Sequence, residues 1–316
     1  MANKTKLRPV LDGDFWMIGD NPDLGDLQGT GSWGGAPQEC VDHHVFQSAD
    51  GGWHLWGCIR HTAVNRLLYH WRSPELTAEH WEKTGEIIRV DRHDGEDLRE
   101  NPEEEAIQSP YVVREQGLYY MFYGGGGTGA GGENRDLVRQ MCLMTSVNGR
   151  DWVRHLDDEG RSRLFVGPGQ TRDPCVRNFV GLWHIYYAGN HGEGREEPGF
   201  YLRTSEDLLD WSEWKLVHQD PEYGNGHYDT ECPHVVKRGG YYYLFRTQDY
   251  GSASSHVFRS EDPADFGVGD ASDKYVGPIA VAAPEIIVDE DGNEYITSNH
   301  DLEGGTRICR LKWEEE

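Results

Sequence analysis

The chain has 316 residues, with 40 glycines, 11 tryptophans and a formal net charge of −25. Its negative surface should repel nucleic acid and anionic membranes, so neither is expected as a partner. No apolar segment reaches the length needed to span a bilayer, and the N-terminal residues lack the apolar core of a signal peptide. If the sequence is full length, the expected location is the cytoplasm.

Five hairpins with a common pattern follow one another along the chain. Each joins a β-branched run to an aromatic run through a polar turn that contains a glycine, which supplies the positive φ of a tight turn. The hairpins span residues 42–56, 109–123, 173–187, 231–245 and 283–296. Their turn glycines are Gly52, Gly117, Gly181, Gly240 and Gly292.

The spacing of the turn glycines, 52 to 65 residues, suits one four-stranded propeller blade per hairpin. A serine and then an aromatic follow each of the first four hairpins, and we interpret them as the end of the outer strand and a residue that packs back on the sheet. After the fifth hairpin, residues 307–313 are the only strand-like segment. The segment around Phe15–Ile18 is therefore expected to supply the missing strand of that blade. The predicted fold class is all-β, a five-bladed β-propeller forming a single domain over residues 1–316.

The six cysteines have no paired metal-finger spacing, and several lie in apolar strand runs, which predicts buried free thiols. His43, His44 and His54 are not expected to share a metal, because neighbouring residues of a strand point to opposite faces. His300 is either a ligand of an axial ion or an ordinary hydrogen-bonded histidine. The glycine-rich segment 124–132 lacks the Lys-Ser/Thr ending of a phosphate loop and is interpreted as a rim loop. We expect no metal and no cofactor.

Acidic residues open the first strand in three of the hairpins, at Asp42, Asp173 and Glu231. The first strand of each propeller blade lines the central channel, so these side chains should converge. Three converging carboxylates suit glycosidic bond hydrolysis, which needs a nucleophile or base, a protonated acid and a group that holds the sugar and tunes the acid. The alternative is that Asp173 and Glu231 only cap turns.

Two motifs carry a family resemblance. Arg172-Asp173-Pro174 and Glu231-Cys232-Pro233 resemble the Arg-Asp-Pro and Glu-Cys-Pro motifs of glycoside hydrolase family 32, in the clan of five-bladed propeller glycosidases that also contains families 43, 62 and 68. The resemblance implies that Asp173 stabilises the transition state, that Arg172 contacts the sugar and that Glu231 is the general acid/base.

The same resemblance covers Gln108, Ser109 and Asp42, whereas His43 and Trp33 are candidates from their own side chains. Gln108 and Ser109 stand where family 32 has a substrate-contact motif with a serine, and Asp42 has the spacing of its nucleophile but precedes His43-His44 instead of Pro-Asn. His43 is expected near the sugar. Trp33 is a candidate to stack on a sugar ring.

The implied activity is hydrolysis of terminal, β-fructofuranoside-like linkages in an oligo- or polysaccharide. A family 43-like inverting arabinofuranosidase or xylosidase is the first alternative, since the same three positions serve both reactions. A non-catalytic carbohydrate-binding propeller is the alternative from another functional class.

The charge of −25 leads to a prediction about salt. Counterions screen self-repulsion, so the melting temperature at neutral pH should rise as NaCl is added up to about 1 M. Differential scanning calorimetry measures the change. The excess of Asp and Glu with scarce Lys is also typical of proteins from salty environments. A flat or falling melting temperature would remove that interpretation and leave ordinary acidic solubility.

Overall fold

The computed structural model describes residues 4–29, 37–96, 105–126, 140–190, 198–224, 226, 228–300 and 304–316. Within these residues the regular structure is β-strand, apart from two single-turn 3-10 helices, η1 (Gly25–Leu27) and η3 (Pro221–Tyr223). No helix of the described chain is long and apolar enough to cross a membrane.

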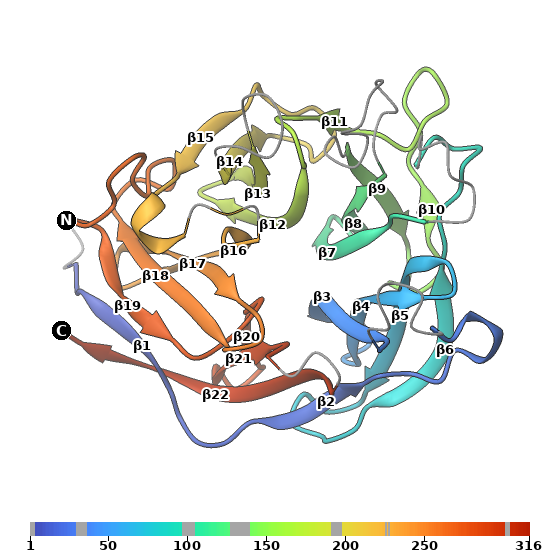
Figure 1. Cartoon of the computed structure of the whole chain (residues 1–316), viewed down its shortest axis with the longest axis horizontal. Helices are drawn as coiled ribbons and strands as arrows, with labels where there is room; N and C mark the ends of the chain where they lie inside the picture. The colour runs from blue at the N-terminus through green and yellow to red at the C-terminus, as the bar shows by residue number, and fades with distance from the viewer. Residues whose placement is uncertain are drawn as a thin grey trace. The chain divides into compact units, whose positions relative to one another are not determined.

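The strands form five sheets that succeed one another along the chain (Figure 1). The first contains β3 (Glu39–Gln47), β4 (Trp53–Thr62), β5 (Asn65–Ser73) and β6 (Glu82–Ile88). The second contains β7 (Gln108–Glu115), β8 (Leu118–Gly125), β9 (Gln140–Ser146), β10 (Val153–Arg154) and β11 (Phe165–Val166).

The third sheet contains β12 (Arg172–Phe179), β13 (Leu182–Asn190), β14 (Pro198–Ser205) and β15 (Lys215–His218). The fourth contains β16 (Glu231–Arg238), β17 (Tyr241–Asp249), β18 (Ser254–Ser260) and β19 (Tyr275–Ile279). The fifth contains β20 (Ile286–Val288), β21 (Glu294–Ser298), β22 (Gly305–Glu315), β1 (Leu7–Leu11) and β2 (Trp16–Asp20).

This succession confirms the predicted fold class, an all-β five-bladed β-propeller. The first strand of every predicted hairpin is the terminal strand of its sheet. The N-terminal segment completes the fifth sheet as expected, although the strand next to β22 in the sheet order is β1, with Leu7 opposite Glu315, and β2 pairs with β22 as an additional strand.

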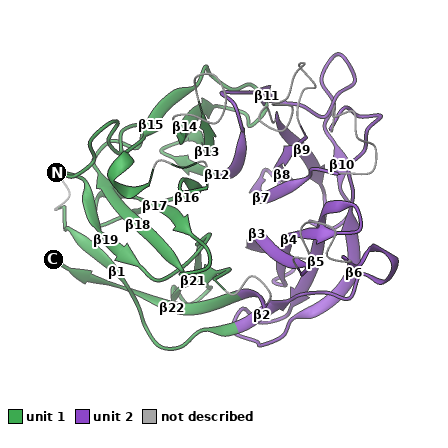
Figure 2. Ribbon diagram, in the orientation of Figure 1, with its two compact units in different colours: residues 1–16, 175–301, 307–316 green, residues 17–174, 302–306 purple. Residues whose placement is uncertain are grey.

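The chain divides into two compact units (Figure 2). Unit 1 comprises Met1–Trp16, Cys175–Asp301 and Arg307–Glu316, and unit 2 comprises Met17–Pro174 and Leu302–Thr306. The single domain over residues 1–316 stays a prediction.

Each unit has its own apolar core between neighbouring sheets. In unit 2, Trp56 and Leu68 of the first sheet pack with Met121 of the second. In unit 1, Phe245 of the fourth sheet packs with Ile296 of the fifth. Full burial of such a side chain contributes about 1.5–3 kcal/mol, so packing between sheets holds the successive blades within each unit.

Two details of the hairpin pattern differ from the prediction. In the first turn the glycine with positive φ is Gly51 (φ 88°) and not Gly52, whereas Gly117 and the other three turn glycines have φ of 83–86°. The repeated serines, of which Ser73 is the first, end the third strand of their sheets and not the outermost one. Their hydroxyls accept a hydrogen bond from the amide two residues on, at 3.1–3.2 Å. That short side-chain turn stops the strand.

The cysteines behave as predicted. All six are free thiols, and all are buried except Cys232, which is half-buried.

Two histidines are buried completely inside the sheets. His70 donates or accepts through both ring nitrogens, to His54 Nδ1 at 2.9 Å and to Thr84 Oγ1 at 3.1 Å. Burial lowers the pKa of His70 to about 2, and burial with the nearby Arg246 lowers that of His218 to about 3. Both are therefore neutral in the folded protein at any pH near neutrality.

These histidines predict acid sensitivity. In the unfolded chain both histidines take up a proton near pH 6.5, whereas in the folded chain they do not. The free energy of unfolding is therefore at its full value above pH 6.5, and below that pH each histidine lowers it by about 1.4 kcal/mol per pH unit. Urea unfolding at pH 7.5 and 5.5 should show this loss, and His218→Gln should reduce it by about 1.4 kcal/mol. The exposed His93 gives the control variant His93→Gln, and equal losses in both variants would contradict the assignment.

Candidate active site

All five hairpins share one unusual backbone position close to the start of the first strand, within it or just before it. A residue other than glycine takes positive φ there: Asp42 (42°), Ser109 (54°), Asp173 (56°), Cys232 (52°) and Ala283 (48°). The strand pairing shifts register at this point in β3, β7 and β16, as at a β-bulge. Bulges re-aim a side chain, and left-handed residues other than glycine cost about 1–3 kcal/mol each and cluster at functional sites.

This position corrects the sequence alignment of the fourth hairpin. Asp42 and Asp173 are equivalent, but their counterpart in the fourth hairpin is Cys232, so the expectation that Glu231 shares their position is wrong by one residue. Glu231 corresponds to the residue before the left-handed one, as Arg172 does in the third hairpin. The proline that follows Asp173 and Cys232 was the signal in the sequence for the correct phase.

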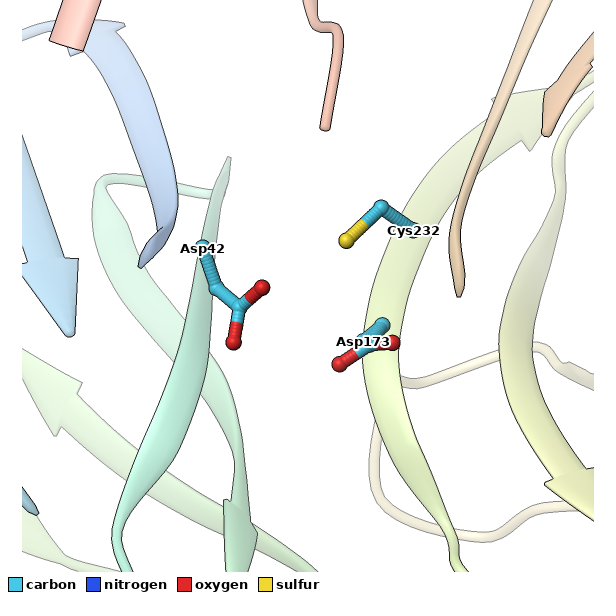
Figure 3. Close-up of side chains that lie close together, drawn as sticks. All are labelled: Asp42, Asp173 and Cys232. Atoms are coloured by element: carbon cyan, nitrogen blue, oxygen red, sulfur yellow. The ribbon is translucent and has the colours of Figure 1, made fainter. Parts of the chain in front are cut away.

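In unit 2, the structure brings Asp42 and Asp173 together around Ser109. Ser109 Oγ lies 2.9 Å from Asp42 Oδ2 and 2.7 Å from Asp173 Oδ1. The three residues are between 4% and 9% exposed. Figure 3 shows the two carboxylates turned toward one another, and an oxygen of one lies within 4.8 Å of an oxygen of the other.

Two arginines balance this buried negative charge. Arg172 Nη1 forms a short ion pair with Asp173 Oδ2, and Arg172 Nε donates to Gln170 Oε1 at 3.2 Å. Arg66 Nη1 lies 4.0 Å from Asp42 Oδ2. Burial opposes the charge of Arg66, but the neighbouring Cys58 and Asp42 outweigh it and raise its pKa, so this arginine stays cationic.

Arg66 and Gln170 were not predicted as site residues. Arg66 is the second residue of β5, directly after the turn that joins β4 to β5, and the sequence around it contains no motif. Since β4 and β5 run antiparallel, that turn brings Arg66 back to the end of the sheet where β3 begins.

The other predicted sugar-contact residues lie near the same end of their strands or outside the described chain. Gln108, 2% exposed, directly precedes Ser109, and His43, 5% exposed, directly follows Asp42. His44 packs its ring on Tyr111, with 4.0 Å between centroids. Trp33 lies outside the described residues.

His300 lies in unit 1 in an ordinary histidine environment. Its Nδ1 lies 2.8 Å from Ser298 Oγ, and its ring packs edge-on against Phe15 at 5.0 Å between centroids. These contacts favour the hydrogen-bonded interpretation over an ion ligand.

Glu231, also in unit 1, is the half-buried first residue of β16 and lies opposite Thr247 of β17. The thiol of the next residue, Cys232, lies 2.9 Å from the hydroxyl of Tyr250.

Arg246 holds the segment that leads into Glu231. Its guanidinium, 1% exposed, donates to the carbonyls of Asp220 and Gly224, to Asp229 O and to Thr230 Oγ1. Burial lowers the pKa of Arg246 to about 10, so it remains charged at neutral pH. One buried cation therefore fixes the backbone on both sides of residues 221–228 and sets where β16 begins.

The donor set of unit 2 does not need a metal to be balanced. Asp42 and Asp173 lie close enough to share a cation, but Arg172 and Arg66 already supply positive charge to them. Buried carboxylates that pair with guanidinium groups are compensated without an ion.

No protein-family model matches the chain, and no curated protein matches it. Solved structures do. A thermostable family 43 glycoside hydrolase has a TM-score of 0.62 and 19% identity, covering 87% of this chain and 89% of that one. The GH43_1 enzyme from Xanthomonas citri in complex with xylotriose has a TM-score of 0.60 and 14% identity, covering 87% and 86%. The GH32 β-fructofuranosidase of Bombyx mori has a TM-score of 0.56 and 16% identity, covering 86% and 59%.

At these identities the likeness concerns the fold, which is the fold of the clan that the motifs resemble. Six of the similar structures are family 43 enzymes.

The contacts of Arg246 predict a large loss of stability when its charge is removed. Arg246→Met should lower the free energy of unfolding by about 3 kcal/mol or more, because buried carbonyls lose their donors. Urea unfolding measures the change. Arg8→Met is the control, since Arg8 pairs with Glu314 at the surface and should change stability by less than about 0.5 kcal/mol. Similar losses in the two variants would refute the anchoring role.

Proposed function

We propose that this protein is an inverting glycoside hydrolase of the family 43 type that acts on β-xylosides or α-arabinofuranosides. The observation that carries the proposal is the buried pair Asp42 and Asp173, bridged by Ser109. All three residues have positive φ, in strands β3, β12 and β7. The fold shared with family 43 enzymes supports it.

The proposed roles follow from the surroundings of each residue. Asp42 is the general base that takes a proton from the attacking water. Asp173, paired with Arg172, stays ionised and stabilises the positive charge that develops on the sugar ring. Glu231 is the general acid that gives its proton to the leaving oxygen. Arg172, Gln108 and His43 contact the sugar.

The proposed substrate is a neutral pentose oligosaccharide. Two similar structures, the Xanthomonas citri enzyme and a compost-metagenome β-xylosidase/α-arabinofuranosidase, are complexes with xylotriose. A chain with a net charge of −25 also disfavours anionic sugars through its overall field.

Hydrolysis with inversion is the prediction that tests this function. Proton NMR of the reaction with 4-nitrophenyl β-xyloside should show α-xylose as the first product, and an α-arabinofuranoside should give the β-anomer. Sucrose and inulin should react slowly or not at all.

Asp42→Asn should lower kcat/KM by about 10²–10⁴ on every substrate. Glu231→Gln should do so only where the leaving group is poor. Asp270→Asn, at an exposed carboxylate, is the control.

Two outcomes would replace the proposal. A product of retained configuration, with sucrose as a good substrate, would establish the family 32-like reaction that the Arg172-Asp173-Pro174 and Glu231-Cys232-Pro233 motifs suggest. Absence of hydrolysis, with sugar binding that Glu231→Gln leaves unchanged, would establish a carbohydrate-binding propeller.

A further inference from the structure

The contacts of Ser109 raise a question of proton number. Its hydroxyl has one hydrogen, yet Oγ lies within hydrogen-bond distance of Asp42 Oδ2 and Asp173 Oδ1. Ionised carboxylates only accept. When both aspartates are ionised, one hydrogen serves two acceptors and one of the two contacts is not a full hydrogen bond.

The count changes when Asp42 takes up a proton. Asp42 can then donate from Oδ2 to Ser109 Oγ, and the hydroxyl can turn its own hydrogen to Asp173 Oδ1. Two contacts are then served by two hydrogens. No O–H bond of Ser109 breaks, because the hydroxyl only rotates.

The two arginines favour protonation of Asp42 over protonation of Asp173. Arg172 contacts Asp173 directly, whereas Arg66 stands 4.0 Å from Asp42. The closer guanidinium keeps Asp173 ionised more strongly than Arg66 does Asp42. An added proton therefore goes to Asp42.

We propose that Ser109 is a reversible hydroxyl bridge that makes Asp42 a better proton acceptor by passing its hydrogen bond to Asp173 when Asp42 is protonated. Ser109 is thus a positioning residue that acts through the two aspartates. The catalytic consequence rests on the proposed function, in which Asp42 takes the proton of the attacking water and Glu231 gives one to the leaving oxygen.

The other groups of unit 2 around Asp42 do not change which of the two aspartates takes up the proton. Among the described residues of unit 2, the charged or titratable groups that face it are Arg66 from β5, Asp173 with Arg172 from β12, and Cys58 from β4. Burial raises the pKa of the Cys58 thiol to about 11, so it is neutral over the working range.

The sign of one shift tests the bridge. We would titrate the carboxyl carbon of Asp42 by ¹³C NMR in the wild type, Ser109→Ala and Ser109→Gly, with Asp42→Asn to assign the signal. In both variants, the state with protonated Asp42 loses one more hydrogen bond than the state with ionised Asp42. The titration midpoint of Asp42 should therefore fall by about 0.5–1 pH unit. Ala retains the left-handed strain at φ 54° and Gly relieves it, so equal shifts exclude a backbone effect.

The opposite results would overturn the bridge. A midpoint that rises means that Ser109 only supports ionised Asp42, an unchanged midpoint means that the hydroxyl has no electrostatic role, and different shifts in Ala and Gly mean a backbone effect. Ser146→Ala is the matched control, because the described contacts of the Ser146 hydroxyl all lie within its own turn.

Catalysis gives a second readout. The acid limb of kcat/KM against pH should move down by the same amount in Ser109→Ala, and an upward move would overturn the bridge. The NMR titration needs no turnover. If the wild type hydrolyses none of the glycosides but the Ser109 variants still lower the Asp42 midpoint, the proposed function is refuted and the bridge is supported.

Discussion

The residue with positive φ close to the start of the first strand of each hairpin is the constraint on which the candidate site depends. At these points the backbone leaves the regular strand, so the side chain is aimed by a bulge and not by the alternation of the sheet. Three of the five positions carry Asp, Ser and Asp, and their side chains meet. The same geometry at Ala283 carries a methyl group. The scaffold is thus repeated, and the chemistry depends on which residue occupies each copy.

Charge compensation is the second requirement, and it is stricter because the chain as a whole is acidic. A buried carboxylate without a partner would be expelled or protonated. In unit 2, Arg172 and Arg66 meet this need for Asp173 and Asp42. In unit 1, Arg246 is the reverse case, a buried cation surrounded by carbonyl oxygens. Both arrangements fix geometry through directional bonds rather than through packing.

The fold was readable from the sequence because its signals are local: alternating strands, aromatic runs and turn glycines recur at one spacing. Asp42, Ser109 and Asp173 were readable for the same reason, since each opens a hairpin. The position of Glu231 was misjudged because the three acidic residues were aligned with one another, whereas Cys232 is the residue equivalent to Asp42 and Asp173. Arg66 and Arg246 carry no local signal, because their roles arise from strand pairing that only the folded chain defines.

The pairing of β1 with β22 has a consequence for how the protein folds. Arg8 and Glu314, which bond across this pair, are 306 positions apart in the sequence. Closing a flexible loop of that length costs about 5 kcal/mol of chain entropy. During synthesis β1 leaves the ribosome long before β22, its pairing partner. The fifth sheet is therefore completed last, and until then β1 has an unpaired edge that could associate with other chains.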